Sequence, residues 1–194
     1  MTPKLGQTPS QTVGPYFSMR MATDDAESVL PVPEGAQRIV ITGTVYDGDG
    51  NHVEDALVEF WQANPAGRYD HPDDQRDIDL SDGFTGFARA KSDFETGLYR
   101  IETVKPGSVP DPEGEPQAPH IAVIVQARGM LNPVFTRIYF SDEERANEHD
   151  LVMRRVPTER RTTLIASLVE GSDPTEYRFD IRLQGDNETV FFDV

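Results

Sequence analysis

The residue of this chain best suited to metal chemistry is His120, which opens the apolar run of residues 120–126 directly after a proline-rich stretch. Such a run is typical of a β-strand, in which side chains two residues apart point the same way. A second histidine at position 122 would aim two imidazoles at one metal ion. The residue there is Ala122, whose methyl group cannot be a ligand. The pattern indicates half of a metal site, in a chain that assists chemistry done elsewhere.

No other pattern in the chain points to a catalytic centre. The histidines are His52, His71, His120 and His149, and no two of them have a spacing typical of metal ligands. The chain has neither a Gly-rich phosphate loop nor the Gly-x-Ser-x-Gly turn that exposes a catalytic serine. With 0 cysteines it can form neither disulfides nor thiolate metal sites. A hydrogen-bonded structural histidine is therefore the alternative interpretation of His120.

The chain is strongly acidic. Its 34 acidic and 18 basic residues give a formal net charge of −16. This charge repels nucleic acid and anionic lipid, so we expect neither as a partner, and an anionic substrate would need a local cationic group. No stretch approaches the ~18 apolar residues of a membrane helix, and the first residues form no apolar signal sequence. We therefore expect a cytoplasmic protein.

The elements that would position His120 are short strands. The length of 194 residues fits one domain of the larger β type. Alternating or β-branched segments predict strands at residues 38–46, 53–62, 84–90, 98–104, 120–127, 136–140, 177–183 and 189–192. Ser141 and the acidic residues after it predict the start of one short helix, and residues 157–168 predict another. Many short strands with one or two short helices favour a mainly β fold, a β-sandwich.

The first 36 residues are expected to form an extended arm. Their prolines lack an amide donor and disfavour helix in the preceding residue, so this segment should not be a regular central strand. An ordered arm has to lie against its own domain or against a partner subunit. We therefore divide the chain into an arm that contacts a partner, residues 1–36, and a β-sandwich domain, residues 37–194.

Several segments, in order along nearly the whole chain, match a known family. They are Pro9–Tyr16, Gly43–Asp47, Val58–Ala63, Gly67–Tyr69, Thr103–Gly107, Ala118–Ile121, Ala127–Gly129, Thr136–Phe140 and Arg178–Ile181. Each segment alone is a weak signal, but in this order and spacing the chain resembles the intradiol ring-cleavage dioxygenases. The resemblance implies a β-sandwich whose active members hold Fe(III) with two tyrosines and two histidines. Phenolate is a hard anionic donor that stabilises the ferric state.

Residue by residue, the resemblance places two of the four ligand positions on residues without a donor atom. Tyr69 falls at the first tyrosine position and His120 at the first histidine position. The second histidine position is Ala122, and the second tyrosine position falls at Ser108–Val109. This loss is expected of the alpha chain in members that pair it with an iron-bearing beta chain. The resemblance thus implies no metal site in this chain, Tyr69 and His120 as vestigial ligand positions, and Fe(III) held by a partner beta subunit.

The resemblance also implies that the arm of this chain borders the partner's substrate pocket. The family's pocket-lining residues in the arm map to Thr12, Gly14, Pro15 and Tyr16. Glycine permits close approach of the backbone, proline stiffens the segment, and tyrosine supplies an aromatic wall with a polar tip. Simple packing at a subunit interface is the alternative role.

Arg128 is the arginine that matches the family in the segment Ala127–Gly129. Its guanidinium would offset the acidic charge of the chain and hold a substrate carboxylate. It lies 8 residues beyond His120, or ~26 Å along a straight strand at ~3.3 Å per residue. Arg128 should therefore serve a site across a subunit interface. A surface salt bridge is the alternative.

These implications lead to one hypothesis for function and two alternatives. We expect an iron-free subunit of a higher hetero-oligomer that cleaves 3,4-dihydroxybenzoate with O2 to 3-carboxy-cis,cis-muconate, and we expect this chain alone to be inactive. In the first alternative it is a self-sufficient dioxygenase, in which Tyr99, His71 or aspartates of residues 70–82 replace the missing ligands. In the second it is a β-sandwich scaffold without a catalytic role.

Overall fold

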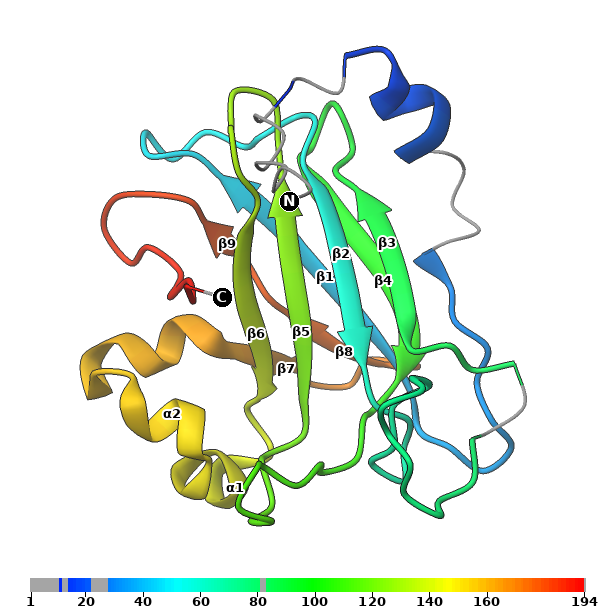
Figure 1. Ribbon diagram of the computed structural model, residues 1–194. Coiled ribbons are helices and arrows are strands. Elements are labelled where there is room, and N and C mark those ends of the chain that lie inside the picture. The colour runs from blue at the N-terminus through cyan, green and yellow to red at the C-terminus, as the bar shows by residue number, and fades with distance from the viewer. Residues whose placement is uncertain (1–10, 12–13, 22–27, 81–82, 194) are drawn as a thin grey trace, which may run out of the picture.

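The main feature of the fold is one sheet of nine strands (Figure 1). The computed structural model describes residues 11, 14–21, 28–80 and 83–193. The strands are β1 (Arg38–Tyr46), β2 (Leu57–Gln62), β3 (Phe87–Lys91), β4 (Leu98–Val104), β5 (His120–Gln126), β6 (Val134–Phe140), β7 (Ile165–Val169), β8 (Thr175–Arg178) and β9 (Ile181–Arg182). Their order in the sheet is β3-β2-β5-β6-β7-β8-β1-β4, and β9 pairs with β1.

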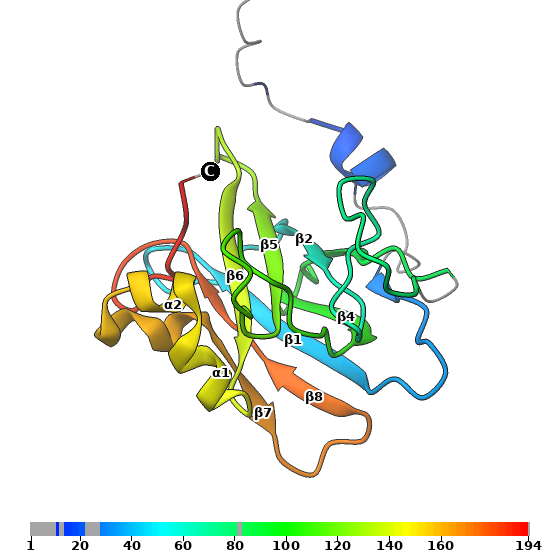
Figure 2. The ribbon, with the colours of Figure 1, turned by 60° about the horizontal axis from the view of Figure 1, so that its bottom comes forward.

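The sheet turns back on itself at β7 and so forms two layers. β7 pairs in parallel with β6 along one edge and antiparallel with β8 along the other. One layer contains β3, β2, β5 and β6, the other contains β8, β1 and β4, and Figures 1 and 2 show them from two directions. The core between them includes Phe60, Ile121 and Ile138 from the first layer and Ile41 and Tyr99 from the second. The predicted mainly β sandwich is confirmed.

The alternation of β5 gives the first layer an inner and an outer face. Ile121, Val123 and Val125 are buried in the core, whereas the residues between them are partly exposed. This period of two is the pattern of a strand with one face against the core. Ala122 therefore lies on the outer face, and His120, two residues earlier, points the same way.

Two predicted strands, 38–46 and 98–104, have the expected bounds in the structure. Others are shifted. β2 begins at Leu57, β3 covers Phe87–Lys91 and β6 begins at Val134. Element ends are set by tertiary contacts, such as the bond from the Ala56 N–H to the hydroxyl of Ser92 at 2.9 Å before β2.

Short helices follow β6 and cover one end of the first layer. They are α1 (Glu144–His149), α2 (Leu151–Arg155) and a 3₁₀ helix (Thr158–Leu164), so the structure contains more helices than the one or two expected. A further helical turn, Phe17–Met21, lies in the arm. In the part of the chain that the structure describes, no helix combines the length and the apolar character needed to cross a bilayer.

The helix predicted over residues 157–168 is wrong in its second half. The chain is helical only as far as Leu164 and then becomes β7. Ile165 and Ala166 pair with the end of β6, and this pairing joins the two layers. Tertiary pairing has overridden the apolar spacing that favoured a helix.

Ser141 does not cap a helix, contrary to the prediction. α1 begins at Glu144, after a residue that makes no side-chain cap, although the acidic first turn is present. The Ser141 hydroxyl instead accepts a hydrogen bond from the Leu168 N–H at 3.0 Å. It thereby ties the end of β6 to β7.

The two C-terminal strand predictions also need correction. The segment 177–183 is divided into β8 and β9, because Phe179 and Asp180 turn aside to bond with β1. The segment 189–192 forms no strand in the described structure beyond a single bridge between Phe192 and β6.

Candidate functional site

The outer face of the β2–β5–β6 layer carries the residues that the sequence associates with metal chemistry. The strand register pairs Trp61 with Ala122 and Ala122 with Arg137, so these side chains form a row across the three strands. His120 points to the same face from the start of β5. Tyr69, in the loop after β2, stacks on Trp61 with ring centroids 5.9 Å apart. The structure thus brings both vestigial positions to one region.

Val109 lies in the same region. A cavity of about 670 Å³ is lined by Tyr69 and Val109 together with Trp61 and Gln117. The two tyrosine positions implied by the family resemblance therefore face one space. One of them, at Val109, presents only an aliphatic side chain.

His120 is held as a neutral ring. It is 5% exposed, and its Nδ1 lies 2.8 Å from the Ala118 carbonyl oxygen. A carbonyl can only accept, so Nδ1 carries the proton and Nε2 of the neutral ring is left as an acceptor. Burial first, and then the positive charge of Arg137, lower the pKa of His120 from 6.5 to about 4. The imidazole is therefore uncharged at neutral pH.

Arg137 is a residue that the motif comparison does not single out. Its Nη1 donates to the Gln117 side-chain oxygen at 3.0 Å and to the Tyr139 hydroxyl at 3.5 Å, which are both neutral partners. Its charge lowers the pKa of His120 and opposes the rise that burial causes in the pKa of Tyr69. A guanidinium thus acts on both vestigial ligand positions at once.

These residues do not fit a ferric ion. Ala122 and Val109 have no donor atom, and burial raises the pKa of the Tyr69 phenol, which disfavours the phenolate that ferric iron prefers. The fixed positive charge of Arg137 would repel a cation beside them. Among the described residues no group of three or more His, Cys, Asp or Glu is placed to hold a metal ion.

Of the substitute ligands of the self-sufficient alternative, Tyr99 and Asp74 are engaged elsewhere, His71 and Asp73 line the cavity beside Tyr69, and Asp82 lies outside the described residues. Tyr99 is fully buried in the other layer, where its hydroxyl donates to the Phe179 carbonyl at 2.5 Å. Asp74 is engaged by the guanidinium of Arg76 at 2.6 and 2.8 Å, which lowers the pKa of that carboxyl. His71 lines the rim of the Tyr69 cavity with an exposed side chain. Tyr99 therefore cannot reach the region.

Asp150 organises the end of this region and is a second residue that the motif comparison misses. It is 0% exposed, and one carboxylate oxygen accepts from the N–H groups of Val152 and Met153 and from the Tyr139 hydroxyl at 2.8, 2.9 and 3.1 Å. The other oxygen accepts from the Ala118 N–H at 3.0 Å. Asp150 thus joins α2, β6 and the segment before β5. An aspartate directly before an apolar helical run is an N-cap signal that could have found it.

The neutral state of His120 makes the fold sensitive to acid. Because the pKa is about 4 when folded and near 6.5 when unfolded, the unfolded chain binds more protons between these values. The stability from the neutral ring is complete above pH 6.5 and is lost as the pH falls toward 4. The groups facing the ring are Arg137, Asp150 and Tyr139. We expect wild type to lose about 2 kcal/mol of unfolding free energy between pH 7 and pH 5 through this residue.

Urea denaturation at the two pH values measures this loss. His120→Asn keeps a donor for the Ala118 carbonyl but cannot titrate, so its pH dependence should be smaller than that of wild type by that amount. His149→Asn, at an exposed histidine, is the matched control and should behave like wild type. Equal pH dependence of wild type and His120→Asn would contradict the expectation.

The residues predicted to bind substrate lie at the opposite end of β5 from His120. A cavity of about 300 Å³ is lined by Gly14 of the arm and by Arg128, together with Asp55 and residues 129–133. Arg128 is 78% exposed, and its Nε lies 3.4 Å from the Asp55 carboxylate. Gly14 has a φ of 61°, a left-handed conformation that favours glycine. The structure therefore places arm and arginine side by side, whereas Thr12 lies outside the described residues.

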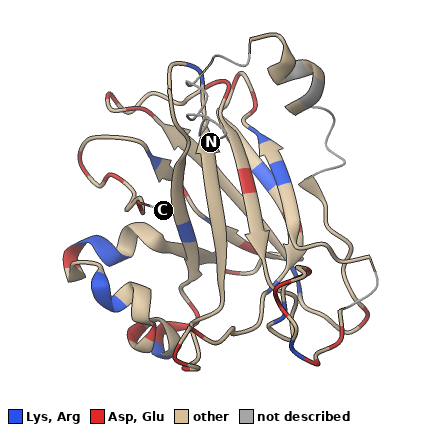
Figure 3. Ribbon diagram, in the orientation of Figure 1, with Lys and Arg blue, Asp and Glu red and all other residues tan. Residues whose placement is uncertain are grey.

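Large apolar side chains are exposed at this end of the molecule. Tyr16 is 64% exposed, Met19 62% and Leu131 80%. Pro15 lies beside Tyr16 in the same turn of the arm. Figure 3 shows charged residues in the helices, the loops and several strands, whereas β5 carries none. Exposed apolar groups around a cationic residue are typical of a surface that a partner covers.

Comparison with known proteins identifies the family. The family described as Dioxygenase matches residues 12–185. The protocatechuate 3,4-dioxygenase alpha chain of Burkholderia cepacia is 46% identical over 98% of both chains. The beta chain of the same enzyme is 37% identical over 79% of this chain and 67% of its own length.

A solved structure shows the same fold. The dioxygenase domain of a carbohydrate-binding fusion protein from Streptomyces sp. SirexAA-E superposes with a TM-score of 0.62 at 24% identity, and the match covers 93% of this chain and 99% of that domain. The fold, the family match and the similarity to a named alpha chain agree with the motif order. The chain therefore belongs to the intradiol dioxygenase family.

Proposed function

We propose that this chain is the iron-free alpha subunit of a cytoplasmic protocatechuate 3,4-dioxygenase whose beta subunit holds Fe(III). The observation that carries the proposal is the degenerate ligand set, with Ala122 and Val109 at ligand positions and the Arg137 guanidinium beside them. The separate similarity to a named alpha chain and a named beta chain supports it. The assembled enzyme would cleave 3,4-dihydroxybenzoate between its two hydroxylated carbons. Both atoms of O2 would enter 3-carboxy-cis,cis-muconate, so no reductant is needed.

The contribution of this chain would be to bind and enclose the substrate at the partner's iron. Fe(III), held by the beta subunit, would supply the Lewis-acid and redox chemistry that the cleavage of the catechol requires. Arg128 would pair with the substrate carboxylate, which the acidic surface of this chain otherwise repels. Thr12, Gly14, Pro15 and Tyr16 of the arm would form one wall of the pocket and exclude water. The exposed Tyr16 and its apolar neighbours would be buried against the beta subunit.

The proposal is tested by producing this chain alone and together with its beta subunit. The iron content of each purified chain, the visible tyrosinate-to-iron absorption and O2 consumption with 3,4-dihydroxybenzoate are measured. We expect iron, colour and turnover only in the assembled enzyme, because this chain lacks two donor positions. The assembly should be a higher hetero-oligomer that contains both chains.

An isolated chain with one equivalent of iron, the visible absorption and substrate cleavage would overturn the proposal and favour a self-sufficient dioxygenase. The iron-bearing beta chain of the assembled enzyme serves as the positive control for iron detection. The scaffold alternative predicts that substitutions at Arg128 leave turnover unchanged in an intact assembly.

A further inference from the structure

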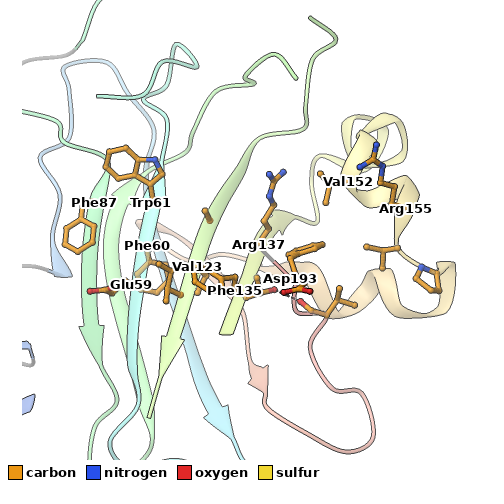
Figure 4. A pocket seen from close by; sticks show the side chains of 17 residues that line it. Glu59, Phe60, Trp61, Phe87, Val123, Phe135, Arg137, Val152, Arg155 and Asp193 are labelled. Atoms are coloured by element: carbon orange, nitrogen blue, oxygen red, sulfur yellow. Dashed lines mark hydrogen bonds between the residues drawn. The ribbon is translucent and has the colours of Figure 1, made fainter. Parts of the chain in front are cut away.

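A cavity of about 880 Å³ lies on the outer face of the β2–β5–β6 layer and has a mainly apolar lining. Trp61 on β2 and Arg137 on β6 flank it on either side of Ala122, and Figure 4 shows the two side chains projecting from the sheet in the same direction. The methyl group of Ala122 leaves the space between the indole and the guanidinium open. Phe87 and Phe135 add further aromatic surface to the lining.

Among the described residues Arg137 has no direct carboxylate partner, and the buried Asp150 is linked to it only through the Tyr139 hydroxyl. The two hydrogen-bond partners of Arg137, Gln117 and Tyr139, are neutral. Of the carboxylates that line the cavity, Glu59 is bound by Arg89 at 2.8 and 2.5 Å, and Asp193 is exposed to solvent. A half-buried guanidinium with spare donors binds an anion more strongly than a fully hydrated one.

We propose that this cavity binds an aromatic monocarboxylate, with the carboxylate on Arg137 and the ring in the aromatic space beside Trp61. A planar guanidinium fork matches a carboxylate, and its remaining donors, Nε and Nη2, are the pair that such an anion would engage. The apolar lining and the aromatic side chains favour a ring. A dianion such as a phosphate ester would need a second half-buried cation, whereas Arg155, the other arginine of the lining, is exposed. The site needs neither iron nor a partner subunit.

Trp61 is the only tryptophan of the chain and lines both this cavity and the smaller one beside Tyr69, so its fluorescence detects binding and the variants below assign it to one cavity. The full-length chain is titrated with benzoate and, separately, with benzamide, a neutral molecule of nearly the same shape. We expect a saturable change in Trp61 emission with benzoate and binding of benzamide that is at least about 10-fold weaker, since a charge-assisted hydrogen bond contributes about 1.5–3 kcal/mol. Arg137→Gln should weaken benzoate binding by a similar factor.

Three further results distinguish binding at this site from an unspecific effect of benzoate on Trp61 emission. Ala122→Val keeps the guanidinium but fills the space beside it, and it should also weaken binding. Arg155→Gln is the control for general loss of positive charge and should bind benzoate like wild type. Equilibrium dialysis should give one benzoate per wild-type chain. The proposal is overturned if emission does not saturate, if benzamide binds as well as benzoate, or if Arg137→Gln and wild type bind alike while circular dichroism shows both folded.

Because the titration uses this chain alone, its failure leaves the proposed alpha-subunit function untouched. Conversely, a chain that binds its own iron could still hold benzoate at Arg137. The iron experiment and the fluorescence experiment therefore test the two proposals independently.

Discussion

Replacing Asp150 with alanine is expected to lower the free energy of unfolding by about 3–5 kcal/mol, the range for removing one partner from a buried charged network. The carboxylate is fully buried and accepts four hydrogen bonds, three from backbone N–H groups and one from the Tyr139 hydroxyl. Alanine leaves all four donors without their acceptor inside the protein, and each unsatisfied buried donor is costly. The start of α2 also loses its cap.

Urea denaturation at pH 7, followed by far-ultraviolet circular dichroism, measures this loss. Asp111→Ala is a matched control, since Asp111 also accepts two backbone N–H groups, at 2.9 Å each, but in an exposed turn. It should cost about 1 kcal/mol or less, because water replaces the lost acceptor. Asp150→Asn, which keeps the shape but not the charge, should fall between the two. A loss for Asp150→Ala no larger than for Asp111→Ala would show that the buried network does not hold this end of the fold.

The strands could be predicted where a segment carries its own alternating or β-branched pattern. β4 alternates between buried and exposed residues, and β1 is rich in β-branched residues although it is buried on both faces; the two strands pair with each other, and both have the predicted bounds. β7 could not be predicted because its parallel pairing with β6 joins residues far apart in sequence, such as Tyr139 and Ile165, although its pairing with β8 is local. The same apolar residues satisfy a helical spacing, and only the joining of the two layers decides between them.

The residues of the candidate site likewise divide into those that the sequence reveals and those that only the fold reveals. His120 and Arg128 could be singled out because they belong to motifs whose order can be recognised in the linear sequence. The roles of Arg137 and Asp150 depend on partners brought together by the fold, namely Gln117 and Tyr139 for one and Ala118 for the other. The defect at Ala122 was visible in the sequence, but the guanidinium that stands next to it across the strand was not.

Replacing Arg128 with glutamine is expected to raise the KM of the assembled enzyme for 3,4-dihydroxybenzoate about 30-fold or more. In the proposed complex this guanidinium pairs with the substrate carboxylate in a site enclosed by two subunits, and truncating one member of an enclosed charge pair costs about 2–5 kcal/mol. Arg128→Glu should weaken substrate binding further, because it adds a negative charge to an already acidic chain. Steady-state O2 consumption by assemblies of unchanged subunit composition measures both effects.

Asp55→Asn separates substrate binding from a surface ion pair. Asp55 and Arg128 lie 3.4 Å apart, and an exposed pair of this kind contributes about 0–1 kcal/mol. If that pair were the whole role of Arg128, the two substitutions would have the same small effect. We expect Asp55→Asn to leave KM near the wild-type value or to lower it, since the guanidinium is freed for the substrate. Catechol, which lacks the carboxylate, should be cleaved equally by wild type and Arg128→Gln, and an equal loss on both substrates would place the effect of Arg128 in assembly instead.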